Sequence, residues 1–380
     1  MPQSRLRAVF MRGGTSKAVI FRRADLPENA AAWPPIFTRV MGSPDPNMRQ
    51  LDGMGGGISS LSKICIIGPP SRADADVDYT FAQISVDLDL VDFASNCGNM
   101  SSAVGPFAVE EGFVPRPNGT EAVVRIHNTN TQKIIVSRFQ MDGDYAAVDG
   151  DLVLDGVAGS GAPIQLEFLA PAGARTGKLV PAGAATQKLV VPGVGTIDAS
   201  MIDAAAPCVF VRAGDLGCTG TERPDAMERD APLQEKLEAI RRAASVAMGI
   251  APDIEAAATI RSAPKVAMVT APVEQRTLSG RVMAPDESDI LVRMISIGQP
   301  HRAVPLTGAL CLAVACRVPG SIPHDIAAGE GDVRIGHPSG MVLVAADVRA
   351  GPAGIEAPSA TVYRTARRLF QGEVLFRTPQ

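Results

Sequence analysis

The chain has 380 residues, more than one hydrophobic core usually organises, so we expect two lobes with a cleft between them. Apolar residues make up 46% of the chain and charged residues 20%, a balance typical of a globular protein and not of a disordered one. The net charge is only −4 and the lysines and arginines form no basic run, which argues against nucleic acid or an anionic membrane as a partner.

The sequence shows no sign of a membrane segment or of an oxidising compartment. No apolar stretch reaches the roughly 18 residues needed to span a bilayer, and the N-terminus lacks an apolar signal core. The six cysteines include no C-x-x-C pair, and most lie in apolar runs where a thiol acts as a small hydrophobic group. We therefore predict a cytoplasmic protein with neither a disulfide framework nor a metal site.

Short apolar runs bounded by Gly or Pro indicate tightly turned, strand-rich lobes. The alternation of Ile84, Val86 and Leu88 favours a sheet with one buried face. In the first half of the chain, we predict strands at residues 8–11, 64–67, 81–90, 121–126, 133–136, 146–154 and 164–168.

The middle of the chain predicts a connection and a surface helix. Residues 171–192 contain Pro-Ala-Gly-Ala twice and few large apolar side chains, so we expect a crossover between lobes there. A helix is predicted at 230–248, with Asp230 as its N-cap and Gly249 as its terminator. Its apolar residues recur at helical spacing: Leu233, Leu237, Ile240 and Ala244. Further strands are predicted at 266–270, 290–297, 333–335, 341–346 and 359–363.

The two halves resemble each other at one point, since residues 97–104 can be laid over residues 307–314. Both segments indicate a turn that opens an apolar, buried helix. A helix N-terminus offers free backbone N–H groups and a favourable dipole to a carboxylate. The repeat therefore suggests two carboxylate-binding helix ends, one from each lobe.

Two blocks of small and polar residues border predicted strands. Residues 11–17, Met-Arg-Gly-Gly-Thr-Ser-Lys, suit a loop whose backbone approaches a ligand closely, although a plain β-turn is the alternative. Residues 52–63 are rich in glycine and serine and end in Lys63, directly before an apolar strand. Desolvation lowers the pKa of a lysine, and a neutral amine is a competent base. The alternative for Lys63 is a solvated lysine at a strand edge.

A third block, residues 95–107, places Cys97 at the start of a predicted helix. The helix dipole favours a thiolate at that end, which makes Cys97 a candidate for chemistry. A buried structural cysteine is the alternative.

Together these blocks resemble the 2-methylaconitate isomerase (PrpF) family, which includes 3-methylitaconate and 4-oxalomesaconate isomerases and has the diaminopimelate epimerase-like fold. The shared motifs are residues 11–17, Gly-Ser-Pro-Asp-Pro at 42–46, the glycine–serine block at 52–63, and Asn-Cys-Gly-Asn with Ala-Val-Gly-Pro-Phe-Ala within 96–108. The resemblance continues through residues 176–178, 264–265, 306–308 and 336–340, and so spans nearly the whole chain.

The resemblance implies an α+β fold of two similar lobes, each a curled, antiparallel-rich, barrel-like sheet around a central helix, with the ligand between the lobes. We assign residues 1–185 to the N-terminal lobe, which carries the catalytic pair, and residues 186–380 to the C-terminal lobe. Return of the last segment to the first lobe is an open alternative.

The resemblance also implies the site. Lys63 and Cys97 match the catalytic lysine and cysteine of the family. The residues expected to bind the substrate are Thr15, Ser16, Asn96, Gly98, Asn99, Lys265, His301, Thr307, Gly308, Ser339 and Gly340. The implied partner is a small di- or tricarboxylate, with no metal or organic cofactor required, and a homodimer is left open.

One departure from the wider fold indicates the reaction. Amino-acid epimerases of this fold present one cysteine from each lobe, but here Thr307 stands opposite Cys97 in the internal alignment. A threonine hydroxyl is far too weak an acid for that role, so racemisation by two thiols is disfavoured. A lysine and a cysteine instead suit a 1,3-proton shift in an allylic system, through a dienolate whose charge hydrogen-bond donors stabilise.

Three alternatives stay open at this point. The first is keto–enol tautomerisation of a 4-oxalomesaconate-type substrate. The second is a non-catalytic accessory protein of propionate metabolism. The third is a thiol hydrolase that pairs Cys97 with a histidine, although no recognised signature surrounds His127, His301, His324 or His337.

Overall fold

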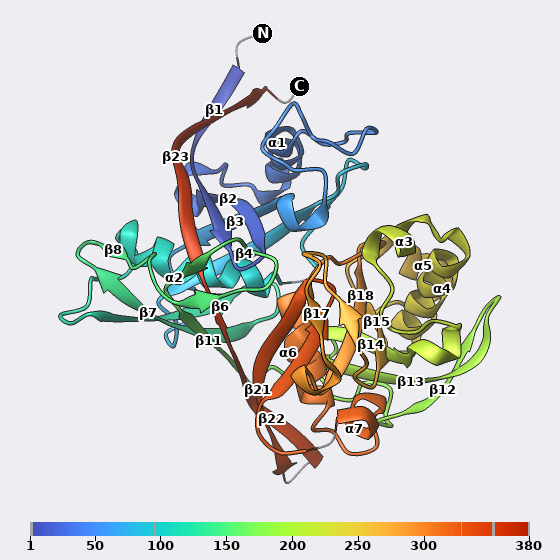
Figure 1. Cartoon of the computed structure of the whole chain (residues 1–380). Coiled ribbons are helices and arrows are strands. Elements are labelled where there is room, and N and C mark those ends of the chain that lie inside the picture. Colours follow the sequence, from blue (N-terminus) through green and yellow to red (C-terminus); the bar gives the residue numbers. More distant parts are fainter. Residues whose placement is uncertain (1–2, 95, 328, 352–353, 379–380) are drawn as a thin grey trace. The chain divides into compact units, whose positions relative to one another are not determined.

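The computed structural model describes residues 3–94, 96–327, 329–351 and 354–378 (Figure 1). The chain forms two compact units: unit 1 comprises Met1–Leu166 and Arg364–Gln380, and unit 2 comprises Glu167–Tyr363. The boundary expected from the sequence between residues 185 and 186 stays a prediction; by its contacts the chain passes from unit 1 to unit 2 after Leu166 and returns to unit 1 at Arg364. Each unit mixes helices with a large sheet, which confirms the predicted α+β class.

Unit 1 is built on one curled sheet in the order β23-β1-β2-β3-β4-β6-β7, antiparallel except for the β2–β3 and β4–β6 pairs. Its long strands are β1 (Gln3–Gly13), β2 (Ser16–Arg22), β3 (Lys63–Gly68), β4 (Val77–Ile84), β6 (Glu121–Asn128), β7 (Lys133–Asp142) and β23 (Ala366–Arg377). Shorter strands are β5 (Val91–Asp92), β8 (Tyr145–Ala146), β9 (Leu152–Val153) and β10 (Ser160–Gly161), and β11 (Ile164–Leu169) crosses the unit boundary.

The centre of unit 1 is helix α2 (Gly98–Glu110), which contacts β1, β2, β3, β6, β7 and β23. Nearly every residue of α2 is buried, including its polar residues Asn99, Ser101 and Ser102. Helix α1 (Trp33–Met41) packs through Ile36 and Phe37 in a separate core that includes Ile64 and Ile66. Among the described residues the sheet curls around α2 without closing into a barrel.

Unit 2 repeats this plan with the order β12-β13-β14-β15-β18-β20-β21-β22. These strands are β12 (Gln187–Val191), β13 (Gly195–Ala204), β14 (Ala206–Arg212), β15 (Lys265–Thr270), β18 (Ile290–Ser296), β20 (Val333–His337), β21 (Gly340–Gly351) and β22 (Gly354–Arg364). The short strands are β16 (Gln275–Arg276), β17 (Val282–Met283) and β19 (Gln299–Pro300). The helices are α3 (Pro224–Arg229), α4 (Ala231–Ala247), α5 (Ile254–Thr259), α6 (Leu306–Ala315) and α7 (Ile322–Ala327).

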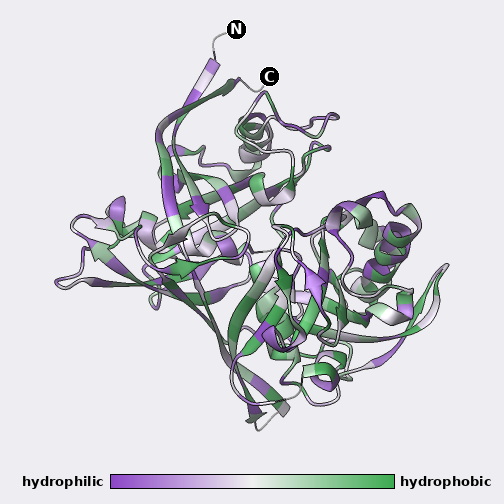
Figure 2. Cartoon of the chain, in the orientation of Figure 1, coloured by the Kyte–Doolittle hydropathy of each residue, from purple (hydrophilic) through white to green (hydrophobic). Residues whose placement is uncertain are grey.

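Helix α6 is the central helix of unit 2, buried along its whole length, and Figure 2 shows it in the hydrophobic colours. Helix α4 is amphipathic and buries Leu233, Leu237 and Ile240 in a core with β12 and β15. The Asp230 side chain accepts from the backbone N–H of Leu233, and Gly249 has a φ of 70° after the last turn, which confirms the predicted helix. No helix in the described part of the chain is long and apolar enough to cross a membrane.

The pairing pattern is duplicated between the units. In unit 1, the successive strand pairs along β1-β2-β3-β4-β6-β7 are antiparallel, parallel, antiparallel, parallel and antiparallel. The pairs along β13-β14-β15-β18-β20-β21 in unit 2 follow the same order. The prediction of two similar lobes is therefore confirmed. The duplication also gives Lys63, the first residue of β3, the same topological place as Lys265, the first residue of β15.

Most predicted strands are found, but two predictions were wrong in extent. The strand predicted at 81–90 ends at Ile84, because Ser85 bonds the Asp87 side chain and the carbonyl of Leu90 in a turn. Residues 146–154 contain only the last residue of β8 and the short strand β9, because Gly150 and its flanking aspartates turn the chain. Strand β12 lies inside the segment predicted as a crossover, and β2, β13, β14 and β23 were not predicted.

Candidate functional site

Lys63 is a buried lysine at the first position of β3, with 7% of its surface exposed. Its Nζ atom donates to Oε1 of Gln83 over 2.5 Å, since the two residues face each other across the β3–β4 pair. The same Nζ lies 5.0 Å from the centre of the Phe81 ring. Lys63 is therefore not a solvated strand-edge residue.

Cys97 is the N-cap of α2 and is 8% exposed. Within the described residues its side chain makes no capping hydrogen bond. The buried hydroxyl of Tyr79, on β4, donates to the backbone carbonyl of Cys97 over 3.3 Å. Burial, followed by the neighbouring Cys65 and Cys97 thiols, raises the pKa of Tyr79 well above 10, so this hydroxyl stays protonated as a donor.

Lys63 lies on the same face of the β3–β4 pair as Tyr79, whose hydroxyl contacts Cys97. Alternate residues of a strand point to one face, and so do residues directly opposite each other in an antiparallel pair. Cys65 lies two residues after Lys63, and its sulfur is 3.9 Å from the Tyr79 hydroxyl. Lys63, Cys65 and Tyr79 therefore share the face on which the N-terminus of α2 is anchored.

The first glycine block packs against the first turn of α2. Gly13 and Gly14 lie where β1 turns into β2, and Gly14 has a φ of 51°. A Cβ atom added at Gly13 would lie 2.6 Å from the carbonyl oxygen of Asn99. The Asn99 amide donates to Oγ1 of Thr15 over 3.1 Å, and the buried Ser16 begins β2. The close approach that these glycines permit is thus to α2 itself.

The N-terminus of α2 gathers most of the predicted unit 1 residues. Asn96 precedes Cys97 and accepts from the Asn128 amide over 3.2 Å. Gly98 and Asn99 follow, both buried, in the first turn, whose N–H groups have no intrahelical acceptor. Backbone donors, the Cys97 thiol and two amide side chains therefore meet at one helix end.

Sequence reasoning missed two buried side chains of this region, Gln83 and Arg364. Arg364 donates from Nε to Oδ1 of Asn99 over 3.2 Å, and burial lowers the pKa of its guanidinium to about 10. The two residues are separated by 265 positions in the chain. Gln83 was predicted only as part of a strand. No pattern in the neighbouring sequence indicates that either of these polar side chains is buried.

In unit 2, Lys265 and the start of α6 lie together. Lys265 is 5% exposed, and a Cβ atom added at Gly308 would lie 3.8 Å from its Cδ atom and would collide with the sulfur of Met294. Thr307 is buried in the first turn of α6. The absence of a side chain at Gly308 thus leaves room for the lysine stem and for Met294.

The remaining predicted residues of unit 2 lie at the end of β19 and at the start of β21. The backbone N–H of His301 donates to the carbonyl of Met294 over 2.8 Å. The Ser339 hydroxyl donates to the carbonyl of Arg302 over 2.6 Å, and Gly340 begins β21 with a φ of 147°. Met294 therefore links the His301 turn to Gly308 and Lys265, and Ser339 links the same turn to β21.

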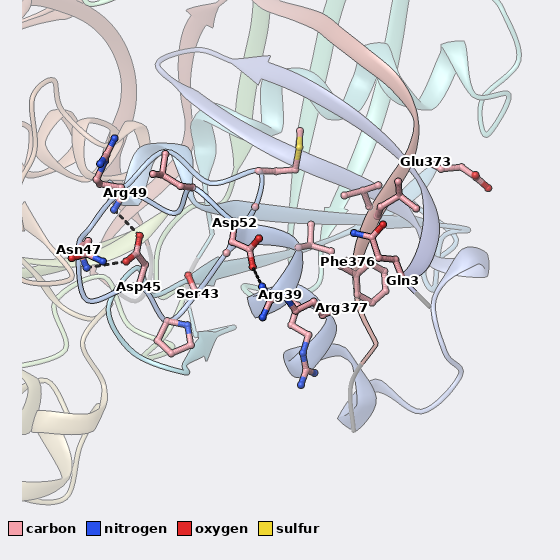
Figure 3. Close-up of a pocket in the computed structure, with 18 of the residues that line it drawn as sticks. Gln3, Arg39, Ser43, Asp45, Asn47, Arg49, Asp52, Glu373, Phe376 and Arg377 are labelled. Atoms are coloured by element: carbon pink, nitrogen blue, oxygen red, sulfur yellow. Dashed lines mark hydrogen bonds and ion pairs between the residues drawn. The ribbon is translucent and has the colours of Figure 1, made fainter. Parts of the chain in front are cut away.

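Unit 1 also contains a charged cavity of about 1020 Å³, shown in Figure 3. Its lining includes residues 42–45 and 52–54 and part of β23, and it includes neither Lys63 nor Cys97. Asp45 accepts from the backbone N–H groups of Asn47, Arg49 and Gln50, and these bonds, that of Asn47 first, lower the pKa of its carboxyl. The Gly-Ser-Pro-Asp-Pro motif at residues 42–46 thus places Asp45 where its carboxylate stabilises the loop that follows.

Two further features bear on the alternatives. Among the described residues, no three His, Cys, Asp or Glu side chains are grouped as they would be around a metal ion. His127 is the histidine of unit 1, and its Nδ1 atom lies 2.8 Å from Oδ1 of Asp78 and 3.2 Å from Oγ of Ser71. His301, His324 and His337 belong to unit 2. The contacts of His127 with Asp78 and Ser71 do not support its pairing with Cys97 in a thiol hydrolase.

Comparison with solved structures identifies the class of fold. A hydroxyproline epimerase from Agrobacterium vitis superposes with a TM-score of 0.58 over 99% of this chain and 94% of its own, at 10% identity. A structure of methylitaconate-delta-isomerase superposes with a TM-score of 0.79 over 99% of this chain and 97% of its own, at 38% identity. The protein thus has the proline racemase and diaminopimelate epimerase-like fold.

Sequence comparison identifies the family. Residues 3–377 match the family described as PrpF protein. The 3-methylitaconate isomerase of Eubacterium barkeri is 40% identical over 98% of this chain and 97% of that relative. The 2-methyl-aconitate isomerase of Shewanella oneidensis is 39% identical over 100% and 98%, and the (4E)-oxalomesaconate Delta-isomerase of Novosphingobium sp. is 38% identical over 96% of each. The chain belongs to the PrpF family and is an isomerase.

Proposed function

We propose that this isomerase acts on a small unsaturated di- or tricarboxylic acid of the 2-methylaconitate type and moves a proton across an allylic system without a cofactor. The names of the relatives support this class of substrate. The observation that carries the proposal is the buried Lys63 on the sheet face to which Tyr79 anchors the Cys97 end of α2.

The proposed reaction has two proton transfers. The neutral amine of Lys63 removes a proton from the carbon next to the double bond, and the electron pair delocalises through the alkene into a carboxylate as a dienolate. The Cys97 thiol then gives a proton to the far carbon of the allylic system, which leaves the double bond displaced by one position. Passage of one proton from the Lys63 ammonium group to the Cys97 thiolate, through solvent, restores both groups for the next turnover. Proton transfer by a positioned side chain of this kind contributes about 10² to 10⁴-fold in rate.

The charge of the dienolate needs donors that are already in place before the reaction. In unit 1 the N–H groups at the start of α2 and the side chains around Thr15 and Asn99 suit this task. We extend the proposal to unit 2, where a buried lysine lies beside the start of the duplicated helix α6. The substrate-binding residues proposed there are Lys265, His301, Thr307, Gly308, Ser339 and Gly340.

A panel of acids tests the proposal directly. The purified protein is incubated in deuterated water with 2-methylaconitate, aconitate, 3-methylitaconate and 4-oxalomesaconate, and each mixture is followed by proton NMR. We expect one acid to isomerise with incorporation of solvent deuterium at the allylic carbon. Absence of isomerisation for every acid would refute the proposed substrate class.

Tautomerisation of a 4-oxalomesaconate-type acid is the second candidate, because two relatives are named for oxalomesaconate and one of them is named a tautomerase. It requires the same base and the same carboxylate donors. The panel separates the two, since a tautomerase would exchange hydrogen in the oxo acid and leave 2-methylaconitate unchanged.

A further inference from the structure

The side-chain amide of Gln83 is fixed in one orientation by its neighbours. Its Nε2 atom donates to the backbone carbonyls of Ser59 and Ser62 over 3.0 and 2.9 Å. A primary amide has two N–H donors, so both are used, and a flipped amide would turn its oxygen against two carbonyl oxygens. The Oε1 atom must therefore face Lys63, whose Nζ atom lies 2.5 Å away.

The carbonyls that hold Gln83 belong to a turn that is itself anchored. Ser59 begins the short 3₁₀ turn before β3 and Ser62 follows this turn, and the Ser62 hydroxyl donates to Oε1 of Gln50 over 2.7 Å. The same Gln50 oxygen accepts from the backbone N–H of Gly57 over 2.9 Å, and Gln50 is 1% exposed. The glycine–serine block thus forms a rigid frame that ends at the Gln83 amide.

We propose that Gln83 is a positioning residue, which orients the Lys63 amine for proton abstraction while leaving its lone pair available to the substrate. This inference rests on the proposed function of Lys63 as a base. A neutral amide oxygen accepts an N–H from the amine but takes no proton from it. A carboxylate at the same place would instead form an ion pair and hold Lys63 as an ammonium group.

Two substitutions are expected to move the pH profile in opposite directions. In Gln83→Glu, the new carboxylate favours the ammonium form, so the ascending limb of kcat/KM should move to higher pH by about one unit or more. In Gln83→Met, the ammonium form loses a charge-assisted acceptor, so the limb should move to lower pH. The kcat of Gln83→Met should also fall about tenfold or more, because the amine is no longer held in line with the substrate.

The measurement is kcat/KM against pH for the acid of the NMR panel that isomerises fastest, with circular dichroism to confirm folding. Gln275→Glu is the matched control, because Gln275 is also a buried glutamine whose oxygen accepts from a buried cation, Arg293, over 2.8 Å. This control should leave the ascending limb in place. If Gln83→Glu does not fold, the direction of the Gln83→Met shift decides.

The role of Gln83 would be overturned if the ascending limbs of the two Gln83 variants coincide with that of the parent protein. It would also be overturned if both limbs shift in the same direction. The Lys63→Met variant separates this failure from failure of the proposed function. If Lys63→Met is inactive while the Gln83 limbs do not move, only the positioning role is refuted. If Lys63→Met remains active, the assignment of Lys63 as the base is refuted.

Discussion

The Tyr79 hydroxyl donates to the backbone carbonyl of Cys97 over 3.3 Å and so ties the N-terminus of the central helix to strand β4. Strand β4 pairs with β3, whose first residue is Lys63. The two residues to which we assign proton transfer are therefore fixed by one sheet face and one helix end, all within unit 1.

Replacement of Lys63 by methionine should reduce kcat/KM by at least about 100-fold while leaving the fold intact, because methionine fills a similar volume but has no basic nitrogen. Steady-state kinetics and circular dichroism measure the two effects. Lys188→Met is the control, since Lys188 is an exposed lysine paired with Asp198 over 3.0 Å. Retention of more than about a tenth of the parent kcat/KM by Lys63→Met would contradict the role.

Cys97 should be the cysteine most sensitive to iodoacetamide, and the substrate acid should protect it. Cys65, Cys208, Cys311 and Cys316 are essentially unexposed, and burial raises the pKa of Cys316 to about 12. Cys218 is more exposed, but burial and then Glu222 and Asp230 raise the pKa of its thiol, which slows alkylation.

Peptide mass spectrometry after brief labelling measures the order of reaction. A Cys218→Ser background removes the competing thiol and serves as the control. Labelling of Cys97 that is equally fast with and without the substrate acid would contradict its place in the binding site.

Local structure could be predicted where the signal is local. The helix at Asp230 and its end at Gly249 follow from a cap, an apolar period and a glycine, all of which lie in one segment. The surroundings of Lys63 could not be predicted, because Gln83 reaches it only through the register of β3 against β4. Arg364 meets Asn99 from 265 positions away, a contact that the curled sheet alone creates.

The glycine motif shows the same difference between local signals and contacts that the fold creates. The glycines at 13 and 14 predict a loop that approaches a ligand closely, but the sequence does not say which group the backbone approaches. The structure shows that their neighbour is Asn99 of α2. Individual residues of a motif can therefore serve packing.

The carboxyl of Glu238 should stabilise the protein above its ordinary pKa and lose this effect in acid. Burial raises the pKa of Glu238, but hydrogen bonds from Arg241 and Arg242, each over 2.7 Å, outweigh it and hold the pKa below 4.5. A lowered pKa in the folded state means stability that is present above pH 4.5 and is lost as the pH falls through the lowered value.

Glu238→Gln should therefore lower the free energy of unfolding at pH 7 by about 1 kcal/mol, a value reduced for the partial exposure of the pair. Urea unfolding at pH 7 and near pH 3 measures the difference, which should shrink in acid. Glu235→Gln, at an exposed position of the same helix, is the control. An undiminished difference in acid would show that the ion pairs with Arg241 and Arg242 are not its cause.

Removal of metals should leave the activity unchanged. The proposed proton transfers use a lysine, a cysteine and hydrogen-bond donors, and no step requires a metal ion. Activity after dialysis against EDTA and then against metal-free buffer should equal that of an untreated sample. Loss of activity that one added metal restores would contradict this prediction.

The most direct test of the account follows solvent deuterium in the parent protein, Lys63→Met and Cys97→Ser with the acid of the panel that isomerises. If Lys63 abstracts the proton and Cys97 returns one, Lys63→Met should neither exchange nor isomerise the acid. Cys97→Ser should still exchange the allylic hydrogen with solvent but form little product, because serine keeps a hydroxyl donor and loses the acidity of the thiol. Isomerisation by Cys97→Ser at nearly the parent rate, or exchange by Lys63→Met, would contradict the two-residue mechanism.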